Sequence, residues 1–139
     1  MRMSIGVAIL SLLTSGPALA VGSSTPYGRG GWFEQFDPIV QQYNQSGEQF
    51  RIEGHCQSAC TLFLGIRNVC IVRSASLLFH AGHDPQRNIK ASATNHLMSA
   101  YNSRLRAYLT ANHVMETLAF HTISGRDMIA KFGYRECSR

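Results

Sequence analysis

The sequence predicts a mixed α/β fold, and three observations lead to that prediction. Apolar residues recur at helical spacing over residues 32–43. Short apolar runs bounded by turn residues follow at 49–53, 69–72 and 76–79, which is typical of strands. A long helical stripe then occupies 97–109. Strands placed between helices along one chain are the order expected of a mixed α/β domain.

Glycine and proline residues mark the ends of the elements predicted in the first half of the chain. Pro38 marks a start or a kink in the helix over 32–43, because proline fixes its own backbone angle and lacks an N–H. Gly54 stops the strand over 49–53. Residues 58–64 are small and then apolar, which predicts a buried helix that Gly65 ends.

The second half is predicted to be mainly helical after the strand over 76–79. The expected elements are a polar loop over 81–95, a helix over 97–109, a helical run over 114–120 and a helix over 124–132. Ser124 has the character of an N-cap, with Asp127 three residues on, and Gly133 ends the last helix.

Residues 1–20 have the features of a secretory signal peptide. Arg2 supplies the positive charge, an apolar stretch spans 5–13, and Ala18-Leu19-Ala20 forms a cleavage box after Pro17. We therefore expect export to the periplasm or the outside of the cell. Residues 21–139 are then a single domain, with no membrane span once the signal peptide is removed.

Composition excludes several other classes. The chain has 139 residues, of which 45% are hydrophobic and 15% charged, so it is not an intrinsically disordered protein. The net charge of +5 is scattered rather than gathered in a basic run. Nucleic acid is therefore not an expected partner.

Four cysteines, an even number, are expected to form disulfides in an oxidising compartment. Cys60 and Cys70 flank a short connection, so they are predicted to pair, which leaves Cys56 to hold the tail through Cys137. The alternative is a metal site built from the cluster His55, Cys56, Cys60, His80 and His83. The spacing lacks a second matching pair, so we expect no metal and no cofactor.

Two residues have the character of a nucleophile and its base. Ser58 follows a tight turn and opens a helix, where the N–H of Ala59 and the helix dipole lie beside its hydroxyl. The alternative is an ordinary N-cap serine. His80 ends a strand and could serve Ser58 as a general base, or it could be a histidine satisfied within the core.

Three stretches together resemble the ClpP/crotonase superfamily, and in particular its small exported ClpP-like proteins. They are GRGGWFEQF (28–36), GHCQSACTLFLG (54–65) and VCIVRSASLLFHAG (69–82). The resemblance implies a truncated ClpP/crotonase-like β-superhelix fragment with flanking helices. It also implies that Ser58 is the nucleophile, that His80 is the general base, and that the N–H groups of Gly31 and Ala59 form an oxyanion hole. The substrate would be a peptide or an ester, attacked through an acyl-enzyme.

The chain departs from that family in two respects. Its proteases use a third, acidic residue. Aligning AKFG (130–133) with the family's last helix places Thr117 near that position, so the adjacent Glu116 is the first candidate for the acid and Asp127 the second. The segment before Gly31 is also short, which suggests a homo-oligomer that completes the core. The alternative function is therefore a catalytically inactive ClpP-like binding or assembly module of the cell envelope. A disulfide-stabilised secreted domain unrelated to the superfamily is a third interpretation.

Overall fold

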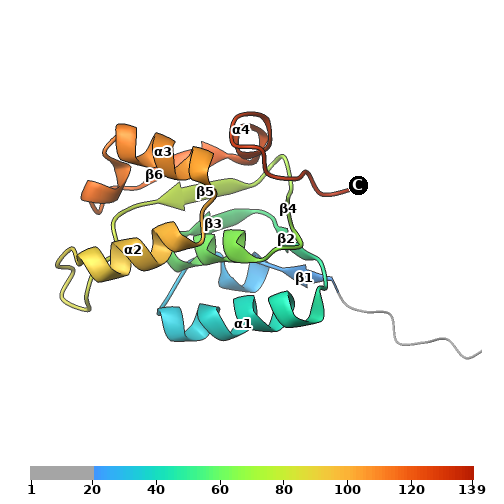
Figure 1. The fold of residues 1–139 in the computed structure, drawn as a ribbon, viewed down its shortest axis with the longest axis horizontal. Coiled ribbons are helices and arrows are strands. Elements are labelled where there is room, and N and C mark those ends of the chain that lie inside the picture. Colours follow the sequence, from blue (N-terminus) through green and yellow to red (C-terminus); the bar gives the residue numbers. More distant parts are fainter. Residues whose placement is uncertain (1–20) are drawn as a thin grey trace, which may run out of the picture.

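Two three-stranded sheets organise the chain in the computed structural model, which describes residues 21–139 (Figure 1). The predicted signal peptide, residues 1–20, lies outside the described residues. The first sheet is parallel and contains β1 (Gly22–Ser23), β2 (Phe50–Ile52) and β4 (Val69–Ile71). The second contains β3 (His55–Gln57), β5 (Ser76–Phe79) and β6 (His121–Ser124), with β3 parallel and β6 antiparallel to β5.

The chain passes from the first sheet to the second twice, and the two passages run side by side. Gly54, at a φ of 65°, turns β2 into β3. The backbone N–H of Val72 donates to Ile52 O at 2.9 Å, and that of Ser76 donates to Gly54 O at 2.9 Å. These bonds keep the chain paired between the sheets, so β3 and β5 end at one common edge.

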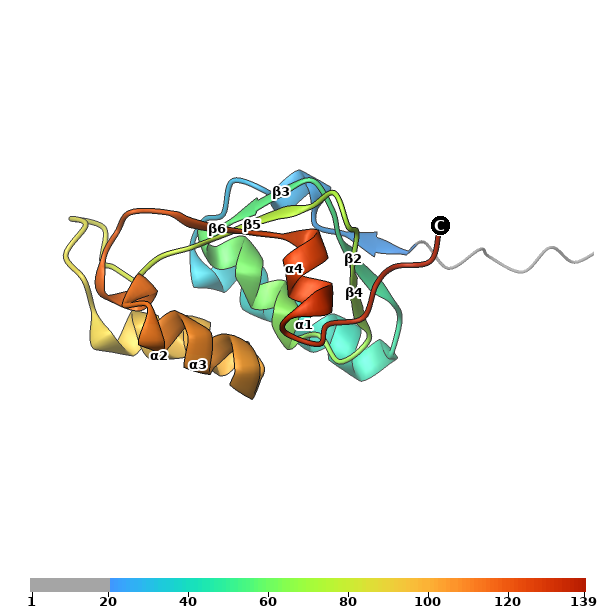
Figure 2. The same ribbon diagram turned by 90° about the horizontal axis from the view of Figure 1, so that it is seen from above.

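Helical segments pack against these strands. The α-helices of residues 21–139 are α1 (Phe33–Ser46), α2 (Ala91–Ser99), α3 (Ser103–Ala111) and α4 (Gly125–Ala130). The same part of the chain forms three 3₁₀ helices, η1 (Thr25–Tyr27), η2 (Ser58–Gly65) and η3 (Val114–Glu116). Figure 2 shows α1, α2 and α3 on one side of the strands β3, β5 and β6.

The 3₁₀ helix η2 lies at the centre of the core. Its residues Ala59–Leu64 are all buried, and it packs against α1, α2, β3 and β5. The Phe63 ring lies 4.4 Å from that of Phe50 and 5.3 Å from that of Phe36, measured between centroids. Full burial of such a side chain contributes about 1.5–3 kcal/mol. The core therefore fixes the segment that carries Ser58 at its start.

Several sequence predictions are confirmed. The fold is mixed α/β, a helix follows Trp32, and strands occupy the stretches predicted over 69–72 and 76–79. Residues 58–64 are helical and buried, although with 3₁₀ geometry. Ser124 caps α4 by accepting a hydrogen bond from the N–H of Asp127 at 3.1 Å.

Other predictions are wrong at the level of single elements. The helix expected over 97–109 is two helices, because Asn102 accepts a bond from Leu105 N at 2.9 Å and caps α3. The loop expected over 81–95 already contains the start of α2 at Ala91. Of the helical run over 114–120 only η3 forms, preceded by His113 at a φ of 55°. The very short strands β1, β3 and β6 were not predicted.

The predicted disulfide pairing is also wrong. Cys56 is bonded to Cys60, and Cys70 to Cys137. The C-terminal tail lies along β4, where Cys137 N donates to Ile71 O at 3.0 Å, so Cys137 meets Cys70. The turn between β3 and η2 meanwhile brings Cys56 and Cys60 to a Cα–Cα distance of 5.3 Å. Within residues 21–139, no helix has the length and apolar character needed to cross a membrane.

Candidate active site

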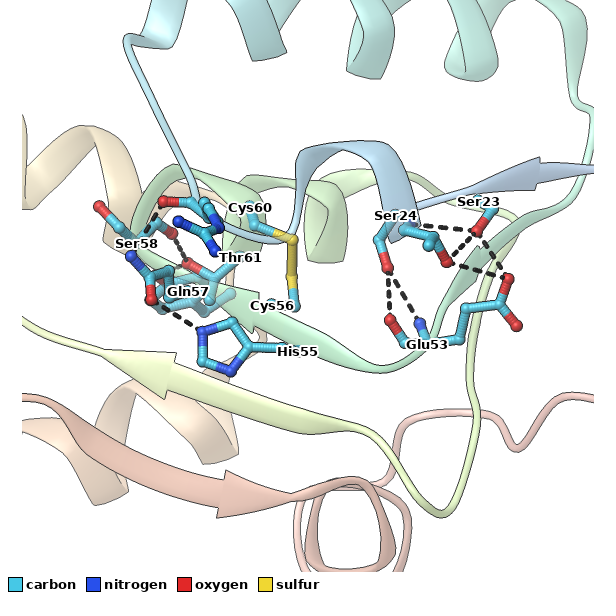
Figure 3. Close-up of a disulfide and its surroundings, with 12 residues drawn as sticks. Ser23, Ser24, Glu53, His55, Cys56, Gln57, Ser58, Cys60 and Thr61 are labelled. Carbon is cyan, nitrogen blue, oxygen red and sulfur yellow. Dashed lines mark hydrogen bonds between the residues drawn. A yellow bond between two sulfur atoms is a disulfide. The ribbon is translucent and has the colours of Figure 1, made fainter.

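Ser58 occupies a strained position between β3 and η2 (Figure 3). Its φ of 56° lies in the left-handed region, which a residue other than glycine adopts only at an energetic cost. Gln57, not Ser58, is the N-cap of η2, and no side chain there accepts a capping bond. The ordinary N-cap interpretation of Ser58 is therefore wrong.

The hydroxyl of Ser58 has no hydrogen-bond partner among residues 21–139. Every buried side-chain oxygen or nitrogen in this part of the chain has a hydrogen-bond partner, so an atom without a partner, such as Ser58 Oγ, is not buried. The Oγ atom therefore reaches solvent. The carbonyl of Ser58 is held instead, because Thr61 Oγ1 donates to it at 2.7 Å. Thr61 Oγ1 also lies 2.5 Å from the hydroxyl of the buried Tyr101.

The loop containing Gly30 and Gly31 lies against Ser58. A Cβ placed on Gly30, whose φ is 74°, would lie 3.0 Å from Ser58 Cβ and 3.4 Å from Ala59 N. Within the described part of the chain, the N–H groups of Gly31 and Ala59 donate to no acceptor. Unpaired backbone donors aimed at one point can stabilise a developing oxyanion, so these two N–H groups are candidates for that role.

His80 is buried, with 6% of its surface exposed, and its ring is oriented by the backbone. Its Nδ1 lies 2.5 Å from the carbonyl oxygen of Ala81. Since a carbonyl oxygen only accepts, Nδ1 carries the proton and Nε2 presents a lone pair. Nε2 has no partner within residues 21–139, and like Ser58 Oγ it is not sealed from solvent.

Burial is the main reason why the pKa of His80 is lowered from the ordinary histidine value. The bond to Ala81 O partly opposes this effect, and the charges of His83 and Arg87 add to it. A lowered pKa keeps the imidazole neutral at neutral pH, which is the form a general base requires. The ring is enclosed by those of Phe120, at 5.2 Å and edge-on, and His83, stacked at 5.7 Å.

The parallel pairing of β3 with β5 brings Ser58 and His80 to one edge of the second sheet. Gln57 is paired with Leu78, so Ser58 leaves its strand beside the residues that lead into His80. Gly82 and His83, which follow His80, line a cavity of about 110 Å³ together with Ser58 and Gly31. Its other lining residues are Trp32, Phe33, Glu34 and Leu97.

The predicted acidic residues are engaged elsewhere. Glu116 Oε2 lies 3.0 Å from His113 Nδ1, and both side chains are largely exposed. Asp127 Oδ2 lies 3.2 Å from Lys131 Nζ on α4. Thr117, the residue aligned with the family's acid, does lie near His80, since its carbonyl accepts a bond from Ala81 N at 2.8 Å. The backbone carbonyl of Ala81 therefore takes the place beside His80 Nδ1 that a triad carboxylate would occupy.

The structure also bears on the residues proposed for a metal site. Cys56 and Cys60 are joined in a disulfide and are not available as thiolate ligands. His55 Nε2 lies 2.7 Å from Gln57 Oε1 on the exposed side of β3. Sequence reasoning considered His83 only as a metal ligand and missed its place in the cavity, although its spacing of three residues from His80 was visible.

Comparison with protein-family models, with curated proteins and with solved structures found no match for this chain.

Proposed function

We propose that the protein is a serine hydrolase of the ClpP-like type, with a ClpP/crotonase-like fold and a Ser58–His80 dyad. The observation that carries the proposal is the Ser58 hydroxyl, unpaired within residues 21–139, which lies in a cavity that Gly31 also lines and is followed in the chain by the unpaired N–H of Ala59. The strained φ of Ser58 supports it, because such strain gathers at functional sites.

In the proposed reaction, Ser58 Oγ attacks the carbonyl carbon of a peptide or ester while His80 Nε2 takes the hydroxyl proton. The oxyanion accepts hydrogen bonds from Gly31 N–H and Ala59 N–H. The intermediate collapses to an acyl group on Ser58, and His80 returns the proton to the leaving amine or alcohol. Water, activated by His80, then releases the acid and restores the free serine.

A fluorophosphonate probe tests this proposal on the oxidised protein. The wild-type protein is expected to be labelled on Ser58, and Ser58→Ala to lose the label. His80→Ala should slow labelling by about 10²–10⁴, the usual contribution of a general base. His113→Ala is the matched control, because that histidine is exposed and its ring faces Glu116 on the surface. Labelling that is absent, or that survives in Ser58→Ala, contradicts the proposal.

A second function is favoured by one observation, the backbone carbonyl that stands where a carboxylate would orient His80. The alternative is a catalytically inactive module that binds or assembles with other cell-envelope components. In that case, cells carrying Ser58→Ala would behave like wild-type cells, and a phenotype that follows Ser58 would exclude this alternative.

We also propose that the protein acts in the periplasm or outside the cell. The two disulfides support this location, since disulfides persist in oxidising compartments. Intact mass of protein recovered from the periplasm should then correspond to a chain that begins at Val21. Recovery from the cytoplasm with residues 1–20 retained and four free thiols would contradict it.

A further inference from the structure

The Cys56–Cys60 disulfide spans the turn that contains Ser58, two residues from the serine on each side (Figure 3). We infer that this disulfide is a positioning device, which holds the Ser58 hydroxyl and the Ala59 N–H in their reactive arrangement. The inference rests on the proposed hydrolase function and adds to it a role for two residues that touch neither substrate nor reacting atoms.

Both ends of the disulfide are anchored in the core. Cys56 lies in β3 and is paired with Leu77 of β5, whereas Cys60 lies in η2. Both cysteines are 0% exposed. The covalent ring therefore joins two fixed elements, and only Gln57, Ser58 and Ala59 lie between them.

Apart from the disulfide, few interactions restrain the backbone of Ser58. Thr61 Oγ1 holds the Ser58 carbonyl, and Gln57 Nε2 donates to Arg29 O at 2.9 Å. The Ser58 side chain forms no hydrogen bond within residues 21–139 that would fix its unusual φ. A ring closed across three residues limits their rotation, so the disulfide opposes relaxation of Ser58 to a negative φ.

Loss of the disulfide should affect Ser58 and Ala59 but not His80. Rotation at Ser58 moves Oγ and turns the N–H of Ala59, the next residue along the chain. His80 follows β5, and Ala81 O sets its tautomer, so the ionisation of His80 does not depend on the disulfide. Loss of the disulfide should therefore lower the limiting reaction rate without moving the pH at which His80 titrates.

The test compares two double variants with the wild-type protein by fluorophosphonate labelling at saturating probe over a range of pH. For Cys56→Ala/Cys60→Ala we expect the limiting rate to fall about tenfold or more. Tenfold corresponds to about 1.4 kcal/mol, which is within the cost of holding a non-glycine residue in this backbone region. Cys70→Ala/Cys137→Ala is the matched control and should keep its rate within about twofold at temperatures where it is folded.

The pH midpoint of labelling should be the same in all three proteins, which separates positioning from general loosening of the site. Circular dichroism verifies folding, and Cys56→Val/Cys60→Ala, which fills more of the buried space, replaces the alanine pair if that pair does not fold. A folded variant without Cys56–Cys60 that labels at the wild-type rate overturns the inference. If the wild-type protein itself is not labelled on Ser58, the proposed function fails and the inference fails with it.

Discussion

The orientation of His80 is the residue-scale feature on which the proposed reaction depends most. Its Nδ1 faces Ala81 O, and burial lowers its pKa. The imidazole must be neutral to take the Ser58 proton, so labelling should be lost as pH falls through the lowered pKa. We expect a single midpoint below about 6.5, the ordinary histidine value. Labelling rates between pH 4 and 8 measure it, and a midpoint above that value contradicts the account.

The same burial links His80 to stability. Its folded-state pKa lies below its unfolded value, so the unfolded state binds the proton more readily. The contribution is fully present above the unfolded pKa and is lost as pH falls through the folded one. Urea unfolding should show lower stability at pH 5 than at pH 7, and His80→Gln should reduce that difference. An unchanged pH dependence in His80→Gln would show that burial of His80 is not its cause.

Among residues 21–139 no carboxylate is hydrogen-bonded to His80, and this leads to a prediction for Glu116. Glu116 pairs with His113 on the surface, and no hydrogen bond within residues 21–139 joins it to His80. Glu116→Gln should therefore keep the labelling rate within about twofold, whereas loss of a true triad acid costs about 10⁴ in rate. A large loss in Glu116→Gln would show that Glu116 is the third catalytic residue and that the dyad description is wrong.

At the scale of elements, the loop before α1 should affect Ser58 through its backbone. A side chain at Gly30 would meet Gln57 O at 2.8 Å and Ser58 Cβ at 3.0 Å, whereas one at Gly47 would meet nothing within 4 Å. Both glycines have almost the same φ, 74° and 73°. Gly30→Ala and Gly47→Ala should thus share a backbone cost of about 1–2 kcal/mol. Only Gly30→Ala should slow labelling, by about tenfold or more, and equal rates would contradict the loop's role.

The elements also show how far the sequence predicts this structure. The helix after Trp32 was predictable because its apolar stripe is long, and the N-cap at Ser124 because a local hydrogen bond makes it. The break between α2 and α3 was not predictable, since the apolar stripe continues through Tyr101 and the break depends on a capping bond that Asn102 accepts from Leu105 N. Strand β1, of two residues, forms through pairing with β2, which is remote in sequence.

The candidate site was predictable in part for similar reasons. Ser58 and Ala59 are adjacent in the chain at the turn after β3, and Gly31, from the loop before α1, lines the same cavity as Ser58. The disulfide pairing depended on where the C-terminal tail lies, and no local pattern encodes that. His83 lines the cavity because of the path of the loop after β5, which no local sequence pattern encodes.

At the scale of the whole molecule, the tail and its disulfide complete the first sheet. Ile71 N donates to Arg135 O at 2.8 Å, so the tail adds to the edge of β4. The Cys70–Cys137 bond closes a loop of sequence separation 67, against 4 for Cys56–Cys60. Chain entropy then gives about 4 kcal/mol for the long loop and about 2 kcal/mol for the short one.

Urea unfolding of the two double variants measures these contributions to the free energy of unfolding. Cys70→Ala/Cys137→Ala should be the less stable of the two, although it is the one expected to retain labelling. The reverse order of stability, or equal losses, would contradict the expectation that the Cys70–Cys137 disulfide contributes more to stability than Cys56–Cys60. We thus expect Cys70–Cys137 to act mainly on stability and Cys56–Cys60 mainly on the position of Ser58.

The most direct test of the central claim is a crystal structure of the protein after reaction with a fluorophosphonate. The account predicts phosphorus bonded to Ser58 Oγ, with its oxygen about 2.7–3.1 Å from the N atoms of both Gly31 and Ala59. His80 Nε2 should lie within hydrogen-bonding reach of Ser58 Oγ. An adduct on another residue, or a phosphoryl oxygen that points away from both N–H groups, would contradict the claim that this is a serine hydrolase site.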